Sequence, residues 1–135
     1  MIRPSEFEFN AETAVNNAFQ LKSNDNNIPQ KAKKEFDDFV DVLKKNGVDV
    51  IVTEDTPEPH TPDSIFPNNW VSFHDDGTLL LYPMYAVNRR AERKPHVLEQ
   101  IAKQFDIKKK IDLSTYEQQN LFLDDAHCQR MRNDG

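Results

Sequence analysis

The sequence TPDSIFPNNWVSFHDDGTLLLYPMYAVNRR extends from Thr61 to Arg90. It contains two strand-forming runs, WVSFH and TLLLY, joined by DDG. An Asp-Gly pair between apolar runs is a strong hairpin signal, because both residues tolerate positive φ. The consecutive apolar residues of LLLY predict a strand that is buried on both faces. The stretch therefore predicts a hairpin, with Asp63, Asn68 and Asn69 before it and Arg89 and Arg90 after it.

Helices are predicted on both sides of this hairpin. The run KAKKEFDDFVDVLKKNG predicts a helix, because its apolar residues recur at the i, i+3, i+4, i+7 spacing of one helical face. Gly47 is placed to end this helix in the left-handed conformation. A second helix is predicted from about Glu92 to Gln104. The residues expected to face inward are Phe36, Phe39, Val40 and Leu43 in the first helix and Val97, Leu98 and Ile101 in the second.

Strands are expected before and after these helices. The runs VDVIV and IKKKIDL, one after each helix, predict strands, and the alternating Phe7 and Phe9 give a weaker strand signal. The segment TEDTPEPHTPDSIFP contains four prolines, which predicts a restrained, non-helical loop. The order strand, helix, strand, hairpin, helix, strand predicts the mixed α/β fold class.

Length and charge restrict the classes of protein. The 135 residues suffice for one modest domain. A formal charge of -6, from 17 basic and 23 acidic side chains, argues against nucleic-acid binding. The basic run Lys108–Lys110 is expected to be solvated. No apolar run approaches the roughly 20 residues of a membrane span, and MIRPSEFEFN lacks an apolar signal core. These features predict a cytoplasmic protein without nucleic-acid or membrane partners.

The cysteine and the histidines give no sign of a metal site. Cys128 is the single cysteine, so it forms no internal disulfide, and no cysteine pair indicates zinc. Adjacent side chains rarely face each other, which disfavours a catalytic pair of His127 and Cys128. His60 and His74 are expected to be structural or solvated. We therefore expect no metal and no cofactor.

Three polar residues of the opening stretch could hold a small charged molecule. Asp63 lies between Pro62 and Ser64, where turn or capping chemistry explains it as well as a ligand does. A guanidinium, however, donates from a planar fork that a carboxylate meets with two hydrogen bonds. Asn68 and Asn69 are either turn residues or amide donors and acceptors for the same ligand.

Arg89 and Arg90 directly precede the second predicted helix. A solvated helix start is one explanation, although cations at that end oppose the helix dipole. An arginine beside a pocket is well suited to a substrate carboxylate. An aspartate and an arginine in one recess would suit an amino acid with a guanidino or ureido side chain. A small-molecule amino acid is therefore the expected partner.

The motif PDSIFPNNW, with YPM and NRR after it and NNAFQ before it, resembles the amidinotransferase-related hydrolases. These belong to the guanidino-group-modifying superfamily of arginine deiminase and dimethylarginine dimethylaminohydrolase. The resemblance covers residues 1–123 and is nearest to the citrulline-utilisation branch. It implies the N-terminal portion of a five-bladed α/β propeller, the pentein fold, built of ββαβ-like repeats. In this family a cysteine thiolate attacks the guanidinium or ureido carbon, an amine leaves, and water resolves the intermediate.

The resemblance also implies roles for individual residues. Asp63 resembles the carboxylate that binds the guanidino or ureido group. Arg89 resembles the arginine that holds the substrate carboxylate, with Arg90 as the substitute. Asn68 and Asn69 stand where dimethylarginine dimethylaminohydrolases carry acidic residues. Their neutral amides would fit a ureido group better than a guanidinium.

The resemblance stops after QNLFL, and residues 124–135 depart from it. Asp124 stands at the position of the catalytic glutamate, but the glycines that should follow are missing, and Cys128 does not match the family nucleophile. A frameshift or a wrong gene end would produce this change. We interpret the chain as the substrate-binding part of a Cys-dependent hydrolase, inactive alone and, with uncovered strand edges, prone to homo-oligomerise. The alternatives are a non-catalytic amino-acid-binding fragment and an unrelated α/β domain.

Overall fold

The computed structural model describes residues 1–14, 22, 25 and 27–122. The chain divides into two compact units, Met1–Pro67 and Asn68–Gly135. Each unit has its own strands and helices.

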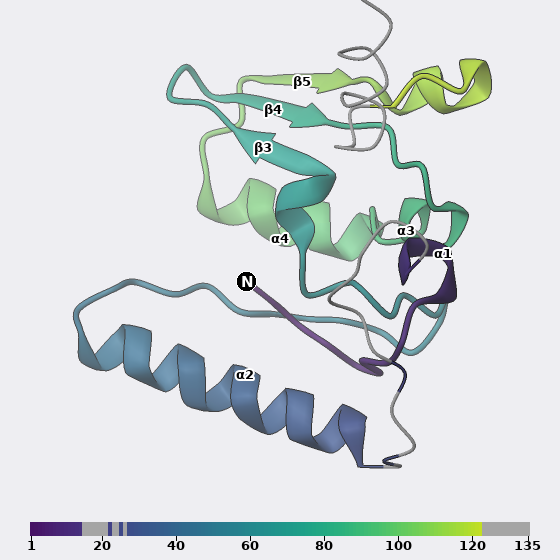
Figure 1. Cartoon of the computed structure of the whole chain (residues 1–135). Helices are drawn as coiled ribbons and strands as arrows, with labels where there is room; N and C mark the ends of the chain where they lie inside the picture. The colour runs from purple at the N-terminus through teal and green to yellow at the C-terminus, as the bar shows by residue number, and fades with distance from the viewer. Residues whose placement is uncertain (15–21, 23–24, 26, 123–135) are drawn as a thin grey trace, which may run out of the picture. The chain divides into compact units, whose positions relative to one another are not determined.

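The described residues of the first unit form two short strands and two helices. Strand β1 (Ile2–Arg3) pairs in parallel with β2 (Thr53–Glu54). Helix α1 (Ala11–Ala14) is a single turn, whereas α2 (Ile28–Lys45) has 18 residues. Figure 1 shows α2 alongside the extended chain that leads to β2.

The first predicted helix is confirmed as α2. Gly47 follows it with a φ of 80°, the left-handed conformation that was expected. Phe36 and Val40 are buried at 4% and 6% exposure, as predicted. The prediction for Phe39 is wrong, because its side chain is 54% exposed. The buried stripe of α2 therefore follows the i, i+4 row through Phe36 and Val40 and is narrower than the sequence pattern.

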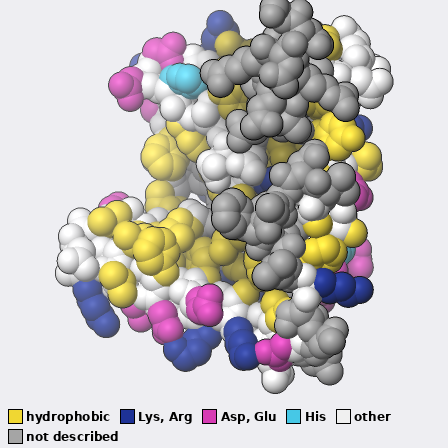
Figure 2. All heavy atoms as spheres, in the orientation of Figure 1, with side chains coloured by type: hydrophobic (Ala, Val, Ile, Leu, Met, Phe, Trp, Pro, Cys, Tyr) yellow, Lys and Arg dark blue, Asp and Glu magenta, His cyan; other side chains and the backbone are white. Residues whose placement is uncertain are grey.

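Several apolar side chains in helix α2 and just after it are exposed to solvent. Figure 2 shows hydrophobic side chains at the surface beside α2. Phe39, Val42 and Val48 are exposed at 54%, 53% and 47%. The first unit thus leaves apolar surface uncovered around the second half of α2.

The strand predicted for VDVIV is wrong. Residues 48–52 form no ladder, and the strand is confined to the next two residues, Thr53–Glu54. The reason is the partner, because β1 offers only two residues for pairing. The proline-rich loop is confirmed as non-helical as far as its last proline, Pro67, where a short 3-10 helix, η1 (Pro67–Asn69), begins.

The second unit is built around the predicted hairpin, which is confirmed. β3 (Val71–Phe73) pairs antiparallel with β4 (Thr78–Leu81), and β4 pairs in parallel with β5 (Lys109–Asp112). Helices α3 (Val87–Arg90) and α4 (Pro95–Gln104) connect β4 to β5, and the 3-10 helix η2 (Ser114–Gln119) follows. The order is strand, strand, helices, strand (Figure 1). The mixed α/β class is therefore confirmed.

Strand β4 contributes buried side chains to the core of the second unit. Leu79 and Leu81 are 4% and 2% exposed, but Leu80 is only half-buried, so one face of the strand is less covered than predicted. Trp70 is fully buried. On α4, Val97 is buried as expected, at 2% exposure.

The second predicted helix is confirmed as α4, but it begins three residues later than predicted. Pro95 explains the difference, because a proline disfavours helical backbone in the residue before it. Lys94 accordingly has extended backbone, with φ -66° and ψ 135°. Within the described ranges, every helix is too short or too polar to cross a lipid bilayer.

The hairpin turn depends on a glycine. Gly77 donates its N–H to the carbonyl of His74 at 2.9 Å, and its φ is 83°. A Cβ at this position would lie 2.9 Å from the Asp106 carbonyl oxygen. The glycine is therefore required by both its conformation and its neighbour.

We expect Gly77→Ala to destabilise the protein more than Gly47→Ala, which is the matched control. Both positions have positive φ, but a Cβ at Gly47 would meet nothing within 4 Å. The left-handed conformation should cost about 1–2 kcal/mol at either site. The clash at Gly77 should add about 1–3 kcal/mol. Urea unfolding measures both, and equal losses would show that the contact with Asp106 is unimportant.

Acid sensitivity should arise in part from an ion pair between β1 and α2. Arg3 donates from Nε and Nη2 to the two carboxylate oxygens of Asp37, at 2.7 and 2.8 Å. These hydrogen bonds hold the pKa of Asp37 below its ordinary value of 3.8. A lowered carboxyl pKa stabilises the folded state above the ordinary pKa, and this contribution is lost as pH falls through the folded value. We expect Asp37→Asn to flatten the pH dependence of unfolding below about pH 4, whereas unchanged curves would contradict this assignment.

Candidate functional site

Asp63 lies in the loop before η1 and is buried, with 2% of its surface exposed. Its backbone carbonyl accepts a hydrogen bond from the N–H of Phe66 at 3.0 Å, which closes a turn. Its side-chain Oδ2 accepts hydrogen bonds from Asn10 Nδ2 at 2.7 Å and Thr13 Oγ1 at 3.0 Å. Both donors belong to the amino-terminal segment. The Asp63 carboxylate therefore makes hydrogen bonds to residues far away in the sequence, in addition to its place in the local turn.

The amino-terminal partner, Asn10, has two tasks. Its Oδ1 accepts the N–H of Glu12 at 3.1 Å, and its backbone carbonyl accepts the N–H of Ala14 at 2.9 Å. Asn10 therefore caps α1 while its Nδ2 donates to Asp63. The sequence offered a signal for the cap, because asparagine before AETA is a common helix start. Nothing in the sequence indicated the long-range contact.

A buried hydroxyl lies next to Asp63 in the chain. Ser64 is 2% exposed, and its Oγ has no hydrogen-bond partner in the described part of the chain. Buried hydroxyl groups are normally paired. Ser64 Oγ is therefore available to a water molecule or a ligand that reaches this turn.

Asn68 and Asn69 lie on η1, and both side chains are exposed. Asn68 Nδ2 donates to Asn69 Oδ1 at 3.0 Å. The two amides therefore form a neutral, solvent-facing pair at the start of the second unit. They can offer donors and acceptors to a ligand, but no charge.

Arg89 lies at the end of α3 and is 6% exposed. Its Nε and Nη2 donate to Oε1 and Oε2 of Glu92 at 2.8 and 3.1 Å. Glu92 is 2% exposed, so the two form a buried ion pair. The expectation that the arginines begin a helix is corrected: they occupy the last turn of α3, where cations suit the dipole. The sequence spacing of three residues between Arg89 and Glu92 was a usable signal for their pairing.

Arg90 contacts the backbone before α3. Its Nε donates to the carbonyl of Met84 at 2.9 Å and its Nη2 to that of Tyr85 at 3.3 Å. Its guanidinium also lies over the ring of Phe122, 5.6 Å from the centroid. These contacts give Arg90 a structural role. They argue against Arg90 as the residue that binds a substrate carboxylate.

Glu117, from η2, supports the same segment. Its Oε1 accepts hydrogen bonds from the N–H of Met84 at 2.8 Å and from Arg93 Nη2 at 2.7 Å. Its Oε2 lies 3.7 Å from Arg90 Nε. Glu117 therefore links the chain after β5 to the loop that carries α3, a role that no sequence pattern indicated.

His60 and His74, which were expected to be structural or solvated, each lie beside a polar side chain. His60 Nε2 lies 2.7 Å from Glu8 Oε1, and His74 Nε2 lies 3.1 Å from Ser72 Oγ. Cys128 and its neighbour His127 lie outside the described residues. Among the residues that are described, no three His, Cys, Asp or Glu side chains gather in a way that could hold a metal ion.

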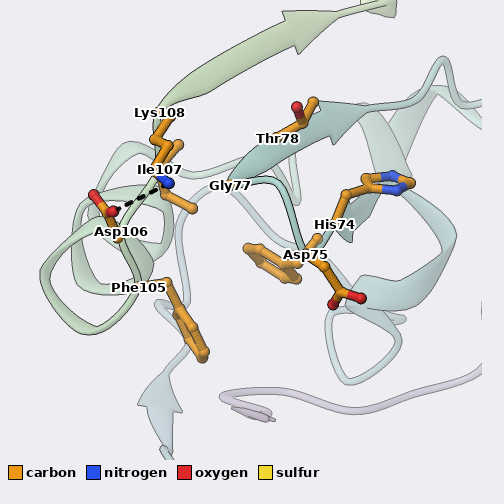
Figure 3. Close-up of a pocket in the computed structure, with 9 residues that line it drawn as sticks. His74, Asp75, Gly77, Thr78, Phe105, Asp106, Ile107 and Lys108 are labelled. Atoms are coloured by element: carbon orange, nitrogen blue, oxygen red, sulfur yellow. Dashed lines mark ion pairs between the residues drawn. The ribbon is translucent and has the colours of Figure 1, made fainter.

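A recess lies at the tip of the hairpin in the second unit. Figure 3 shows it between the hairpin turn and the chain that enters β5, with Asp106 and Lys108 ion-paired at 3.8 Å and the His74 ring turned away. Phe73 and Phe105 stack there, with centroids 5.6 Å apart. None of the five predicted site residues lines this recess, so it is not the predicted substrate site. The lining residues are Phe73, His74, Asp75, Gly77, Thr78, Phe105, Asp106, Ile107 and Lys108.

The five predicted residues are thus divided between the two units. Asp63 belongs to the first unit, and Asn68, Asn69, Arg89 and Arg90 belong to the second. Within their units, Asp63 is anchored to the amino-terminal segment and Arg89 is paired with Glu92.

Comparison with known families gives the class of protein. The family model described as N,N dimethylarginine dimethylhydrolase, eukaryotic, matches residues 3–128. The chain therefore belongs to this family, within the guanidino-group-modifying superfamily that the PDSIFPNNW motif indicated. No curated protein and no solved structure gave a match to the chain.

Proposed function

We propose that the chain carries substrate-binding groups of a hydrolase that cleaves a guanidino or ureido C–N bond of an arginine-like amino acid. The family match makes N,N-dimethylarginine the first candidate substrate. The order of strands and helices in the second unit supports a related proposal, that this unit is one ββαβ repeat of a propeller.

The observation that carries the proposal is the setting of Asp63. Its carboxylate is 2% exposed and accepts hydrogen bonds from two neutral donors, Asn10 and Thr13. These hydrogen bonds orient the carboxylate, and a carboxylate can meet a guanidinium with two charge-assisted hydrogen bonds. In this proposal Asp63 binds the guanidino group.

A second candidate substrate is citrulline, which the citrulline-utilisation branch would use. The neutral amides of Asn68 and Asn69 favour it, because they place no negative charge at η1. A ureido group is uncharged and needs amide donors and acceptors more than it needs carboxylates.

Isothermal titration of the full chain with dimethylarginine, arginine and citrulline distinguishes these substrates. We expect dimethylarginine to bind at least about tenfold more tightly than leucine, the control ligand without a guanidino or ureido group. Tighter binding of citrulline than dimethylarginine would support the second candidate. Equal affinity for leucine and all three ligands would contradict the proposed function.

A further inference from the structure

We infer that Asn10 and Thr13 are positioning residues for Asp63, which the amino-terminal segment holds in its ligand-binding orientation. The inference rests on the proposed function, because it assumes that Asp63 contacts the substrate. Neither residue is assigned a contact with substrate.

Both hydrogen bonds to the Asp63 carboxylate are accepted by the same oxygen atom. Asn10 Nδ2 and Thr13 Oγ1 both donate to Asp63 Oδ2, at 2.7 and 3.0 Å. Two donors that converge on one oxygen fix the rotation of the carboxylate plane as well as its position. A carboxylate held in this way loses little conformational freedom when it meets a guanidinium.

Both donors are also hydrogen-bonded within the turn that forms helix α1. Asn10 is 1% exposed and caps the helix through its Oδ1, so its amide cannot rotate without losing the bond to Glu12. Thr13 Oγ1 also lies 3.3 Å from the Asn10 carbonyl oxygen, one residue before the end of α1. The cap of α1 and the orientation of Asp63 therefore depend on the same asparagine.

The two tasks of Asn10 can be separated by substitution. Asn10→Ser keeps an oxygen that can cap α1 and removes the donor to Asp63. Thr13→Val removes the second donor and keeps the shape of the side chain. Val40→Ala is the matched control, because Val40 is buried on α2 in the same unit and its truncation lowers stability without touching Asp63.

The experiment is a double-mutant cycle on the affinity of the full chain for dimethylarginine. We expect Asn10→Ser to weaken binding about tenfold, the equivalent of one charge-assisted hydrogen bond. Thr13→Val should weaken it less, and Val40→Ala should leave it unchanged at temperatures where each variant is folded. In an Asp63→Asn background, Asn10→Ser should have no further effect, because Asn10 acts through the carboxylate.

The possible outcomes distinguish a failure of the positioning role from a failure of the proposed function. If Asp63→Asn weakens binding and Asn10→Ser does not, the positioning role is wrong and the proposed function stands. A tenfold effect of Asn10→Ser that persists in the Asp63→Asn background would also overturn the positioning role. If Asp63→Asn binds as the wild type does, or the wild type does not bind, the proposed function fails and this inference fails with it.

Discussion

Glu92→Gln is expected to lower the free energy of unfolding by about 3 kcal/mol. Glu92 and Arg89 are 2% and 6% exposed, and two hydrogen bonds of 2.8 and 3.1 Å join them. Removing the negative charge leaves the guanidinium of Arg89 buried without this counter-charge. Breaking one side of a buried pair is costly for that reason. Chemical denaturation of the wild type and the variant measures the difference.

Two further variants test the cause of this loss. Replacing both partners, with Arg89→Met and Glu92→Leu together, should recover much of the stability, because an apolar pair of similar volume leaves no buried charge. Asp38→Asn is the exposed control, since Asp38 and Lys34 pair at the surface of α2 with 62% and 75% of their side chains exposed. That variant should lose far less. A similar loss from Glu92→Gln and Asp38→Asn would show that burial is not the cause.

Asp63→Ala is expected to weaken binding of dimethylarginine by about 2–5 kcal/mol, because it removes the charge that faces the guanidinium. It also removes the acceptor of Asn10 and Thr13, so a loss of stability should accompany it. The affinity must therefore be measured where the variant is folded.

Asp63→Asn separates affinity from stability. Both donors meet the same oxygen, Oδ2, so an amide oxygen can accept both hydrogen bonds while the charge is lost. We expect near wild-type stability with most of the loss in affinity. Loss of stability with unchanged affinity would make Asp63 a tether for the amino-terminal segment alone.

Much of the fold was predictable because local patterns agree with the tertiary structure. The helix at Phe36 and Val40, the hairpin at Gly77 and the strand β5 each have a periodicity or turn signal of their own. The strand expected at VDVIV was wrong because a ladder needs a partner, and β1 supplies only two residues. Pairing of segments so distant in the sequence leaves no local signal.

The sequence predicted which residues belong to the candidate site, but it did not predict the contacts that these residues make. The motif identified Asp63 and Arg89, but the contacts of Asp63 with Asn10 and Thr13 depend on long-range packing. The contact between Glu117 and Arg93 depends on it as well. Arg90 shows the limit most clearly. The resemblance made it the substitute for Arg89, whereas its guanidinium contacts backbone carbonyls and the Phe122 ring.

Carbon NMR of the full chain, with its aspartate carboxyl groups labelled, tests whether Asp63 contacts dimethylarginine during a titration. The Asp63 signal is assigned by its absence in Asp63→Asn. We expect this resonance to shift on binding, because a guanidinium comes into contact with the carboxylate. A saturating titration in which other aspartates respond and Asp63 does not would show that Asp63 does not contact the ligand.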